Sequence, residues 1–117
     1  MEIIGKTNRC SQEAVFLLNQ SLSNNTVLFK KIKRTDIKQP CGSDDTWRFA
    51  FPKKDNYTRV VISTNFTGSG SSWMNAYGFI FTDTYIDIYV RHGYATSGST
   101  SAALEVTVAY VNNNLFL

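Results

Sequence analysis

The sequence predicts an all-β protein, an antiparallel β-sandwich of about six strands. Hydrophobic residues make up 43% of the chain and aromatic residues 14%, and residues of these kinds fit the pleated, half-buried surface of a sheet. From residue 26 onward, apolar and polar residues alternate with the period of two that a strand requires. The segments between are rich in Gly, Ser, Asn and Asp and leave no room for the helical crossovers of a parallel sheet.

Six segments show this alternation, and each is predicted to form one strand: residues 26–34, 47–51, 59–66, 77–82, 85–91 and 104–110. Loops are predicted at residues 40–45, 68–72 and 95–101, where turn-forming residues gather. Pro52 is expected to end the second strand, because proline cannot donate a ladder hydrogen bond. Strict alternation places two sets of residues each on one face of its strand: Val60, Ile62, Thr64 and Phe66 in the third, and Tyr77, Phe79 and Phe81 in the fourth.

A chain of 117 residues has the length of one domain. We predict a sandwich domain over residues 26–117, preceded by a connector segment over residues 1–25. Residues 11–22 are the one candidate helix, with Ser11 as its cap and apolar residues at helical spacing: Ala14, Val15, Leu18 and Leu22. An apolar strand through residues 15–18 is the alternative.

The fifth predicted strand has two faces of different character. One face is apolar and is explained by the core: Ile86, Ile88 and Val90. The other carries a row of polar and aromatic side chains: Tyr85, Asp87, Tyr89 and Arg91. Three explanations are open. The row is a solvent face with cross-strand pairs, a subunit interface, where Tyr and Arg are enriched, or a glycan site, because sugars offer hydroxyls to charged groups and an apolar face to aromatic rings.

Trp73 lies in the Ser-rich segment 68–73, where an aromatic side chain has little core to join. It is therefore a candidate ligand contact, since binding residues are often on loops held by a rigid scaffold. The alternative is that Trp73 closes one end of the sandwich.

A basic run over residues 30–38 holds five of the 12 Lys and Arg residues. In a strand, Lys30 and Lys31 would point to opposite faces, so the run is not one coherent stripe. Lysines on a solvated edge strand deter edge-to-edge pairing. The functional alternative is contact with a polyanion such as lipopolysaccharide phosphate, teichoic acid or nucleic acid, through Lys30, Lys31, Lys33 and Arg34. Nucleic acid is not the expected partner.

The chain lacks the residue groups that catalysis usually needs, and we predict no enzyme activity, no cofactor and no metal site. His92 is the only histidine, and its place at a strand end is typical of a solvated turn residue rather than a base that activates a nucleophile. Glycoside hydrolysis needs two carboxylates at a defined separation, which the sequence does not indicate for Asp83, Asp87 or Glu105. The segment FTGSGSSW, residues 66–73, lacks the Lys-Ser/Thr of a phosphate-binding loop.

Cysteine usage and hydropathy suggest a protein made in a reducing cytosol. Cys10 and Cys41 are predicted to be free thiols, because a disulfide would require an oxidising compartment. No apolar run approaches the roughly 18 residues of a spanning helix. The start of the chain, MEIIGKTNRC, lacks the basic-then-apolar pattern of a secretory signal.

Three segments resemble, in their order, the tip domains at the C-terminus of bacteriophage tail fibres, and the H-type lectin sandwich that such tips sometimes share. They are YTRVVIST (residues 57–64), NAYGFIF (residues 75–81) and LEVTVAYV (residues 104–111), and the resemblance covers residues 49–112. It implies a six-stranded sandwich, trimeric assembly and recognition of cell-surface glycans. It carries over no binding residue. It also implies a virion protein, made in the bacterial cytosol and released by lysis; a cytoplasmic protein is the alternative.

These observations together predict a non-catalytic receptor-binding tip that recognises a bacterial surface polysaccharide. We expect a homotrimer, because the apolar tail of residues 115–117 has no obvious place inside a small sandwich and could pack across an axis. Two alternatives are a structural virion protein, such as a capsid decoration or assembly domain, and a small stand-alone lectin.

Overall fold

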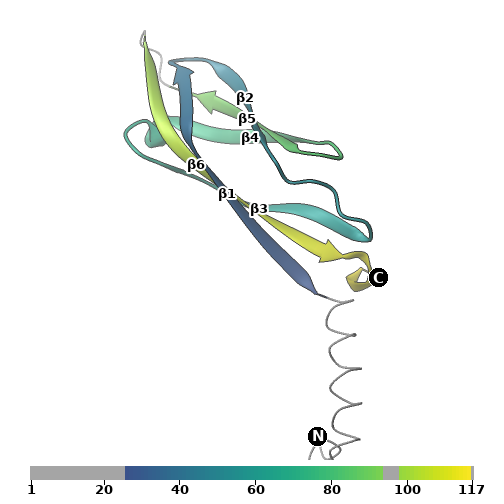
Figure 1. Cartoon of the computed structure of the whole chain (residues 1–117). Helices are drawn as coiled ribbons and strands as arrows, with labels where there is room; N and C mark the ends of the chain where they lie inside the picture. Colours follow the sequence, from purple (N-terminus) through teal and green to yellow (C-terminus); the bar gives the residue numbers. More distant parts are fainter. Residues whose placement is uncertain (1–25, 94–97, 117) are drawn as a thin grey trace, which may run out of the picture.

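The computed structural model describes residues 26–93 and 98–116, in which six strands form two three-stranded antiparallel sheets (Figure 1). Sheet A has the strand order β1–β6–β3, and sheet B has the order β2–β5–β4. The strands are β1 (Val27–Pro40), β2 (Asp44–Phe49), β3 (Tyr57–Thr67), β4 (Met74–Phe81), β5 (Ile86–His92) and β6 (Ser99–Asn112), with two short 3-10 turns, η1 (Ser71–Trp73) and η2 (Asn113–Leu115). The predicted all-β class and the number of strands are confirmed.

Two predicted loops are too long. Pro40 belongs to β1, Asp44 and Asp45 belong to β2, and residues 99–101 already belong to β6. The reason is that β1 and β6 pair from Val27–Val111 as far as Pro40–Ser99. β1 is an edge strand, where proline is tolerated because its missing N–H need not face a neighbour.

Bulges in β3 and β4 overturn the predicted alternation of both strands. The register of β3 against β6 shifts between Val61 and Ser63, so Val60 and Ile62 do not share a face with Thr64 and Phe66. The register of β4 against β5 shifts between Ala76 and Gly78, and Tyr77 therefore faces away from Phe79 and Phe81. One extra residue in a strand places every later side chain on the face opposite to the one that strict alternation predicts.

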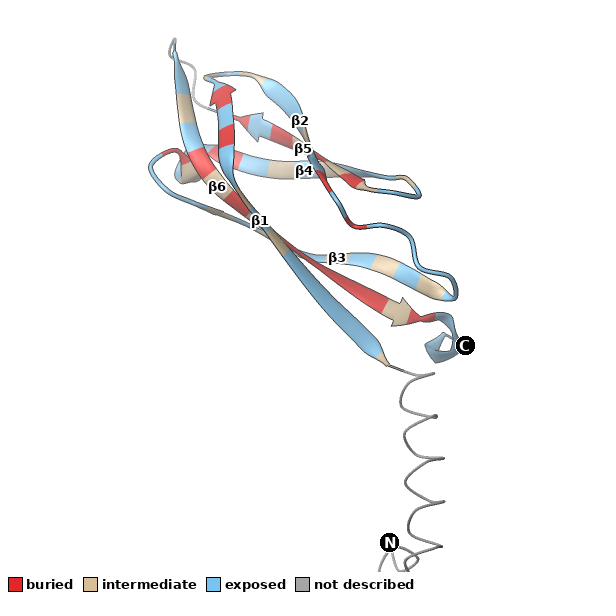
Figure 2. Cartoon of the chain, in the orientation of Figure 1, coloured by how far each residue is buried: buried red, intermediate tan, exposed pale blue. Residues whose placement is uncertain are grey.

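The core lies between the two sheets and is built mainly by their central strands (Figure 2). Six alternate residues of β5 and β6 are completely buried: Ile86, Ile88, Val90, Leu104, Val106 and Val108. Burying a side chain of this kind stabilises the fold by about 1.5–3 kcal/mol. The apolar half of the fifth predicted strand is thus confirmed as a core face.

Gln39 of β1 is a completely buried polar residue that joins the two sheets. Its Nε2 donates hydrogen bonds to the backbone oxygens of Ser43 (3.0 Å) and Val90 (2.9 Å). Its Oε1 accepts a hydrogen bond from the indole Nε1 of Trp47 at 3.0 Å. Val90 belongs to β5, the central strand of sheet B, and Trp47 to β2, an edge strand of that sheet, so one side chain of sheet A is bonded to two strands of sheet B.

His92 is not a solvated turn residue, so that prediction is wrong. It ends β5 with its side chain buried, and its Nε2 is hydrogen-bonded to the hydroxyl of Thr100 in β6. The burial follows from the strand period, because His92 continues the inward series Ile88, Val90.

The connection between β2 and β3, residues 50–56, packs on the part of sheet A next to Tyr110 and Arg59. Phe51 is completely buried. The hydroxyl of Tyr110 donates to the backbone oxygen of Pro52 at 2.7 Å, and Nη1 of Arg59 donates to that of Phe51 at 2.8 Å. Asn56 turns the chain back into β3 with a φ of 66°, a conformation that asparagine tolerates better than most residues.

Some predictions concern residues outside the described ranges: the connector of residues 1–25 with its candidate helix 11–22, Cys10, and Leu117. Cys41 is a free, half-buried thiol. The boundary of the sandwich domain at residue 26 stays a prediction.

Candidate functional site

The outer surface of sheet B, which we call the tyrosine face, carries the row that the sequence singled out. Asp87, Tyr89 and Arg91 of β5 point outward because Ile86, Ile88 and Val90 point into the core. The register adds neighbours from both flanking strands. The tyrosine face consists of Asp44, Thr46 and Arg48 of β2, Tyr85, Asp87, Tyr89 and Arg91 at and before β5, and Tyr77, Gly78 and Ile80 of β4.

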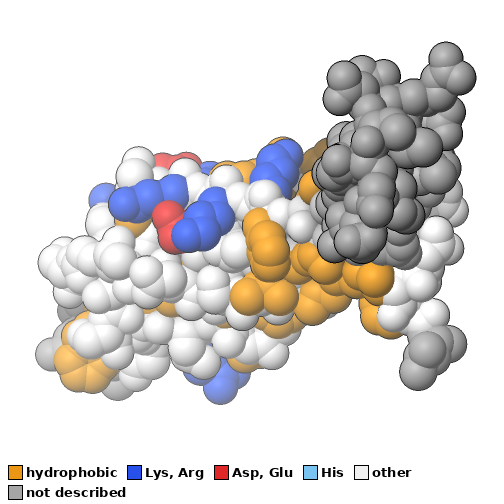
Figure 3. Space-filling view, turned by 90° about the horizontal axis from the view of Figure 1, so that it is seen from below, with side chains coloured by type: hydrophobic (Ala, Val, Ile, Leu, Met, Phe, Trp, Pro, Cys, Tyr) orange, Lys and Arg blue, Asp and Glu red, His pale blue; other side chains and the backbone are white. Residues whose placement is uncertain are grey.

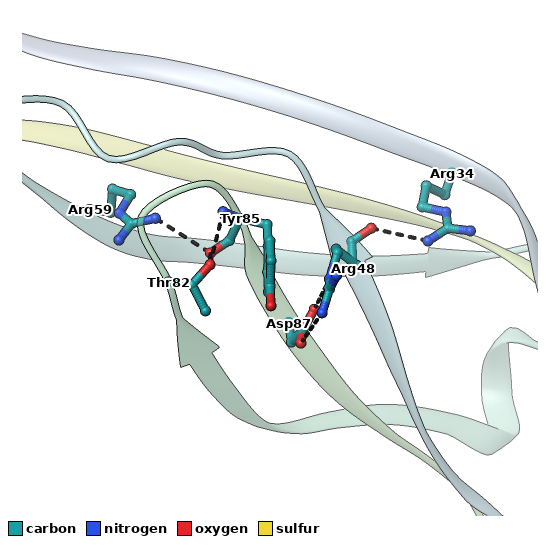
Figure 4. A network of polar contacts seen from close by, with 6 residues as sticks. All are labelled: Arg34, Arg48, Arg59, Thr82, Tyr85 and Asp87. Carbon is teal, nitrogen blue, oxygen red and sulfur yellow. Dashed lines mark hydrogen bonds and ion pairs between the residues drawn. The ribbon is translucent and has the colours of Figure 1, made fainter.

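Two bidentate ion pairs join β2 to β5 across this face. Nε and Nη2 of Arg48 lie 3.0 and 3.3 Å from the two carboxylate oxygens of Asp87 (Figure 4). Nε and Nη2 of Arg91 lie 2.9 and 3.3 Å from those of Asp44. Exposed ion pairs add little to stability, but two-point contacts fix the orientation of the side chains. Their effect here is to hold four charged groups in set positions.

Two tyrosine rings, those of Tyr85 and Tyr77, pack against these charges, and the ring of Tyr89 packs on Tyr77. The guanidinium carbon of Arg48 lies 3.4 Å from the ring centre of Tyr85, and that of Arg91 lies 5.2 Å from the ring centre of Tyr77. The rings of Tyr77 and Tyr89 are 5.8 Å apart. A Cβ atom at Gly78 would come within 3.2 Å of the Tyr89 ring, so this glycine lets the ring lie flat on β4.

The tyrosine face can therefore bind a polyhydroxylated ligand without rearranging. Each arginine uses Nε and one terminal nitrogen on its carboxylate, which leaves the other terminal nitrogen for a further acceptor. A carboxylate oxygen accepts more than one hydrogen bond, so Asp44 and Asp87 can also receive sugar hydroxyls. The ring of Tyr77, whose residue is 50% exposed, offers an apolar surface to a sugar ring.

The ion pairs also set the ionisation of the charged groups. Hydrogen bonds from the Arg91 guanidinium hold the pKa of Asp44 below its ordinary value. Hydrogen bonding to Asp87 and to Asp44 raises the pKa values of Arg48 and Arg91, respectively. A lowered carboxyl pKa stabilises the fold above the pKa of the unfolded chain, and this contribution is lost as the pH falls through the folded value.

Removal of Arg91 is expected to raise the pKa of Asp44 toward its ordinary value. In the Arg91→Gln variant, the carboxyl carbon of Asp44 should titrate at a higher pH than in the unmodified chain, as followed by carbon NMR. Arg48→Gln is the matched control, because Arg48 pairs with Asp87 and should leave Asp44 unchanged. An Asp44 pKa that is the same in all three proteins would mean that the ion pair does not form in solution.

The structure places the predicted site residues in three locations. Tyr85, Asp87, Tyr89 and Arg91 lie together on the tyrosine face. Trp73 lies apart, at the end of η1, where its backbone oxygen accepts a hydrogen bond from Gly93 at 2.7 Å. It is 47% exposed, which leaves the indole accessible to a ligand.

The basic run divides between the two faces of edge strand β1. Lys30 and Arg34 are in register with the inward residues Val108 and Leu104, while Lys31 and Lys33 are in register with Thr107 and Glu105 on the outer surface. Arg34 has a structural role, since it pairs with Asp36, donates to the backbone oxygen of Arg48 and stacks on Trp47. Polyanion contact through the whole run stays a prediction.

Sequence reasoning identified only the β5 row of the tyrosine face and missed its other charged and aromatic members: Asp44, Arg48 and Tyr77. Asp44 and Arg48 are separated by three residues, as are Asp87 and Arg91. When two such strands pair antiparallel in this register, each acid faces an arginine. This repeated Asp-x-x-x-Arg spacing is the signal that could have indicated the pairing. Tyr77 carried no signal, because the bulge beside it is not visible in the sequence.

A second surface, which we call the apolar face, lies on the outer side of sheet A. Ala109 of β6 is flanked in register by Phe29 of β1 and Val60 of β3, and Val111 by Val27 and Thr58. Phe29 is 67% exposed, and Ile62 at the β3 bulge is 55% exposed. We define the apolar face by the exposed residues Val27, Phe29, Val60 and Ile62, together with Val111, which is half-buried, and Ala109, which is buried between Phe29 and Val60. In the view from below, the largest hydrophobic area is continuous, and a smaller one lies at the opposite end of the molecule (Figure 3).

Two of the acids that the sequence analysis considered for glycoside hydrolysis, Asp87 and Glu105, lie on opposite faces of the sandwich. Asp87 lies on the outer side of sheet B and Glu105 on the outer side of sheet A, so the sandwich separates them. Over residues 26–93 and 98–116, no three His, Cys, Asp or Glu residues lie where they could hold a metal ion. In the same ranges, no helix is both long and apolar enough to cross a membrane.

No protein-family model matches the chain, and no curated protein or solved structure is similar to it. The resemblance to tail-fibre tips therefore stays a hypothesis, and the surfaces described above carry the functional argument.

Proposed function

We propose that this chain is a non-catalytic recognition domain that binds a bacterial surface polysaccharide through the tyrosine face. The observation that carries the proposal is the set of paired charges beside tyrosine rings on an open sheet surface. Hydroxyl-rich ligands suit such a surface, because binding requires fixed polar groups with spare hydrogen-bonding capacity next to an apolar platform. Trp73 is a peripheral candidate contact.

The tyrosine face is a weaker candidate for a subunit interface. Charged residues are depleted at interface cores, and burying the Arg48–Asp87 and Arg91–Asp44 pairs would carry a desolvation cost. The apolar face is the better candidate, because no ion pair of this face would have to be desolvated and because large exposed apolar patches mark interaction sites. We therefore assign assembly to the apolar face and recognition to the tyrosine face.

Assembly into a homotrimer fits the role of a phage tail-fibre tip. Leu115 and Phe116, near the C-terminus, are also exposed and can add to a contact between copies. In this role the protein is made in the bacterial cytosol and incorporated into the tail of the virion. Both the role and the location rest on the resemblance of residues 49–112 to such tips.

A structural virion protein is the second candidate, and the apolar face favours it. In that case the chain would assemble through this face, and the tyrosine face would remain an ordinary solvent surface. The two candidates differ in one measurable property, the binding of glycans.

Tyr89→Ala is expected to abolish glycan binding while leaving assembly intact. Anchoring aromatic residues typically cost about 2 kcal/mol when truncated, or roughly thirtyfold in affinity. The measurement is binding of the unmodified chain and the variant to an array of bacterial surface polysaccharides, with the oligomer mass checked in parallel.

Ile80→Ala is the matched control, since Ile80 lies on the same face, is also exposed and has no aromatic ring. Its affinity should fall far less than that of Tyr89→Ala, because Ile80 belongs to the face but offers no ring on which a sugar can stack. If the unmodified chain binds no polysaccharide yet still assembles, the structural candidate replaces the recognition proposal.

A further inference from the structure

A groove of about 490 Å³ lies at the edge of sheet A, away from the tyrosine face. It is lined by Leu28, Phe29 and Lys30 of β1, Tyr110 of β6, and Pro52, Lys53 and Lys54 of the connection 50–56. Its volume falls within the range of about 300–1,000 Å³ that small-molecule sites occupy.

The walls of the groove are fixed by hydrogen bonds. Nζ of Lys30 donates to the backbone oxygen of Ala50 at 3.2 Å, and the Tyr110 hydroxyl donates to that of Pro52 at 2.7 Å. The backbone N–H of Lys53 donates to the backbone oxygen of Asp83 at 2.7 Å, which ties the connection to sheet B. The groove is therefore built by contacts among three separate parts of the chain and does not depend on a ligand to form.

Three lysines give the groove a positive charge. In the described ranges, no carboxylate comes within ion-pair distance of Lys30, Lys53 or Lys54. Lys54 instead lies with Nζ 4.6 Å from the ring centre of Tyr57. Cationic groups around a concave surface with low-dielectric walls attract anions.

The groove also has an apolar component, which a site for a bare anion would not need. Leu28 and Pro52 contribute aliphatic surface beside the lysines, and Tyr110 closes the inner side. A suitable ligand therefore combines a negative group with a ring that has an apolar face. Carboxylated and phosphorylated sugars have this combination.

We propose that the groove is a second carbohydrate subsite, specific for the negatively charged units of an acidic surface polysaccharide. This inference rests on the proposed recognition function and adds to it the chemical class of the ligand. The lysine ammonium groups would pair with a carboxylate or phosphate on the sugar, while Leu28 and Pro52 would contact the sugar ring. Nucleic acid fits less well, because the remaining lysines of β1 (Lys31, Lys33 and Lys38) lie on the other side of the strand.

The test is the affinity of the full chain for tetragalacturonate, measured by isothermal titration calorimetry with the neutral sugar maltotetraose as the reference ligand. We expect binding of tetragalacturonate, and a loss of about tenfold or more in the double variant Lys53→Gln, Lys54→Gln, since two charge-assisted contacts are removed. The matched control is Lys33→Gln, Lys38→Gln, which changes the net charge equally at exposed positions outside the groove. A phosphorylated tetrasaccharide in place of tetragalacturonate tells which anionic group is preferred.

Four results would overturn the groove proposal, and they differ in what they say about the recognition function. Equal losses in both double variants would indicate general attraction of polyanions to the basic run. A loss in Tyr89→Ala alone would place acidic sugars on the tyrosine face and leave that function intact. If neither charged oligosaccharide binds but the chain still binds polysaccharide on the array, the groove proposal is wrong and the recognition function stands. Binding of inorganic polyphosphate as tight as that of both charged sugars would show that the apolar component plays no part.

Discussion

The double variant Phe29→Asp, Ile62→Asp is expected to sediment as a monomer of about 13.2 kDa. The unmodified chain is expected to sediment as a trimer, near three times that mass. Assembly through the apolar face would bury both positions, and an unpaired carboxylate in an apolar contact carries a cost of several kcal/mol. Because Phe29 and Ile62 are 67% and 55% exposed in the single chain, the substitutions should leave the sandwich folded. Far-UV circular dichroism checks this.

Ile80→Asp is the control for that variant. Ile80 is an exposed apolar residue on the tyrosine face, and a charge there should not affect the trimer. If Ile80→Asp dissociates the oligomer and the double variant does not, assembly uses sheet B, and the assignment of the two faces must be exchanged. A monomeric unmodified chain at micromolar concentration would remove the assembly proposal.

Gln39→Leu is expected to lower the free energy of unfolding by about 2–4 kcal/mol. The substitution keeps a side chain of similar size but removes three hydrogen bonds of Gln39. Two of them join the sheets, and the third holds the turn at Ser43. The substitution leaves the backbone oxygens of Ser43 and Val90 and the indole N–H of Trp47 to find new partners. Leaving a buried polar group unsatisfied costs about 1–3 kcal/mol. Water can reach the freed groups of Trp47 and Ser43 in part, and this lowers the total cost. Urea unfolding gives the difference.

Trp47→Phe separates the contribution of the indole from that of the backbone contacts. It removes one of the three hydrogen bonds, so we expect about 1 kcal/mol from the hydrogen bond plus a packing loss of similar size. An unfolding free energy of Gln39→Leu equal to that of the unmodified chain would show that Gln39 does not join the sheets in solution.

The fold class was predictable because apolar and polar residues alternate along the sequence with the period of a strand. The inward series of β5 and β6 alternate without interruption, and each lies at the centre of its sheet. The edge strands were predicted less well. The bulges at Ile62 and Tyr77 change the face of later residues without any change in composition, and a bulge depends on the neighbouring strand rather than on the bulged residue alone.

Burial of Gln39 could not be predicted from local sequence, whereas the burial of His92 was indicated by the strand period of β5. Gln39 and His92 are both completely or almost completely buried, although both residue types are usually exposed or intermediate. The burial of Gln39 depends on partners 4 to 51 positions away in the chain, such as Ser43 and Val90. Similarly, the row on β5 was recognised, whereas its ion-pair partners on β2 required the strand pairing.

The pairing also narrows the explanations for the row on β5. An arginine without an acidic partner beside two tyrosines would suggest that a second copy of the chain supplies the missing carboxylate. Instead, each arginine of the face is held by its own aspartate and stacks on a tyrosine ring. This arrangement leaves neither arginine without an acidic partner and fixes the positions of the side chains. If the face binds a ligand as proposed, such pre-ordering lowers the entropic cost of binding.

Nitration of tyrosines with tetranitromethane, quantified by peptide mass spectrometry, tests the role of the tyrosine face most directly. It is carried out on the assembled protein with and without the polysaccharide that the array identifies, and with Tyr57 of sheet A as the internal reference. We predict that Tyr77 and Tyr89 react in the assembled protein and become protected only when the polysaccharide is bound. Protection of both in the assembled protein without polysaccharide would make this face a subunit interface, and equal reactivity in both conditions would make it a plain solvent surface; either result would contradict the proposal.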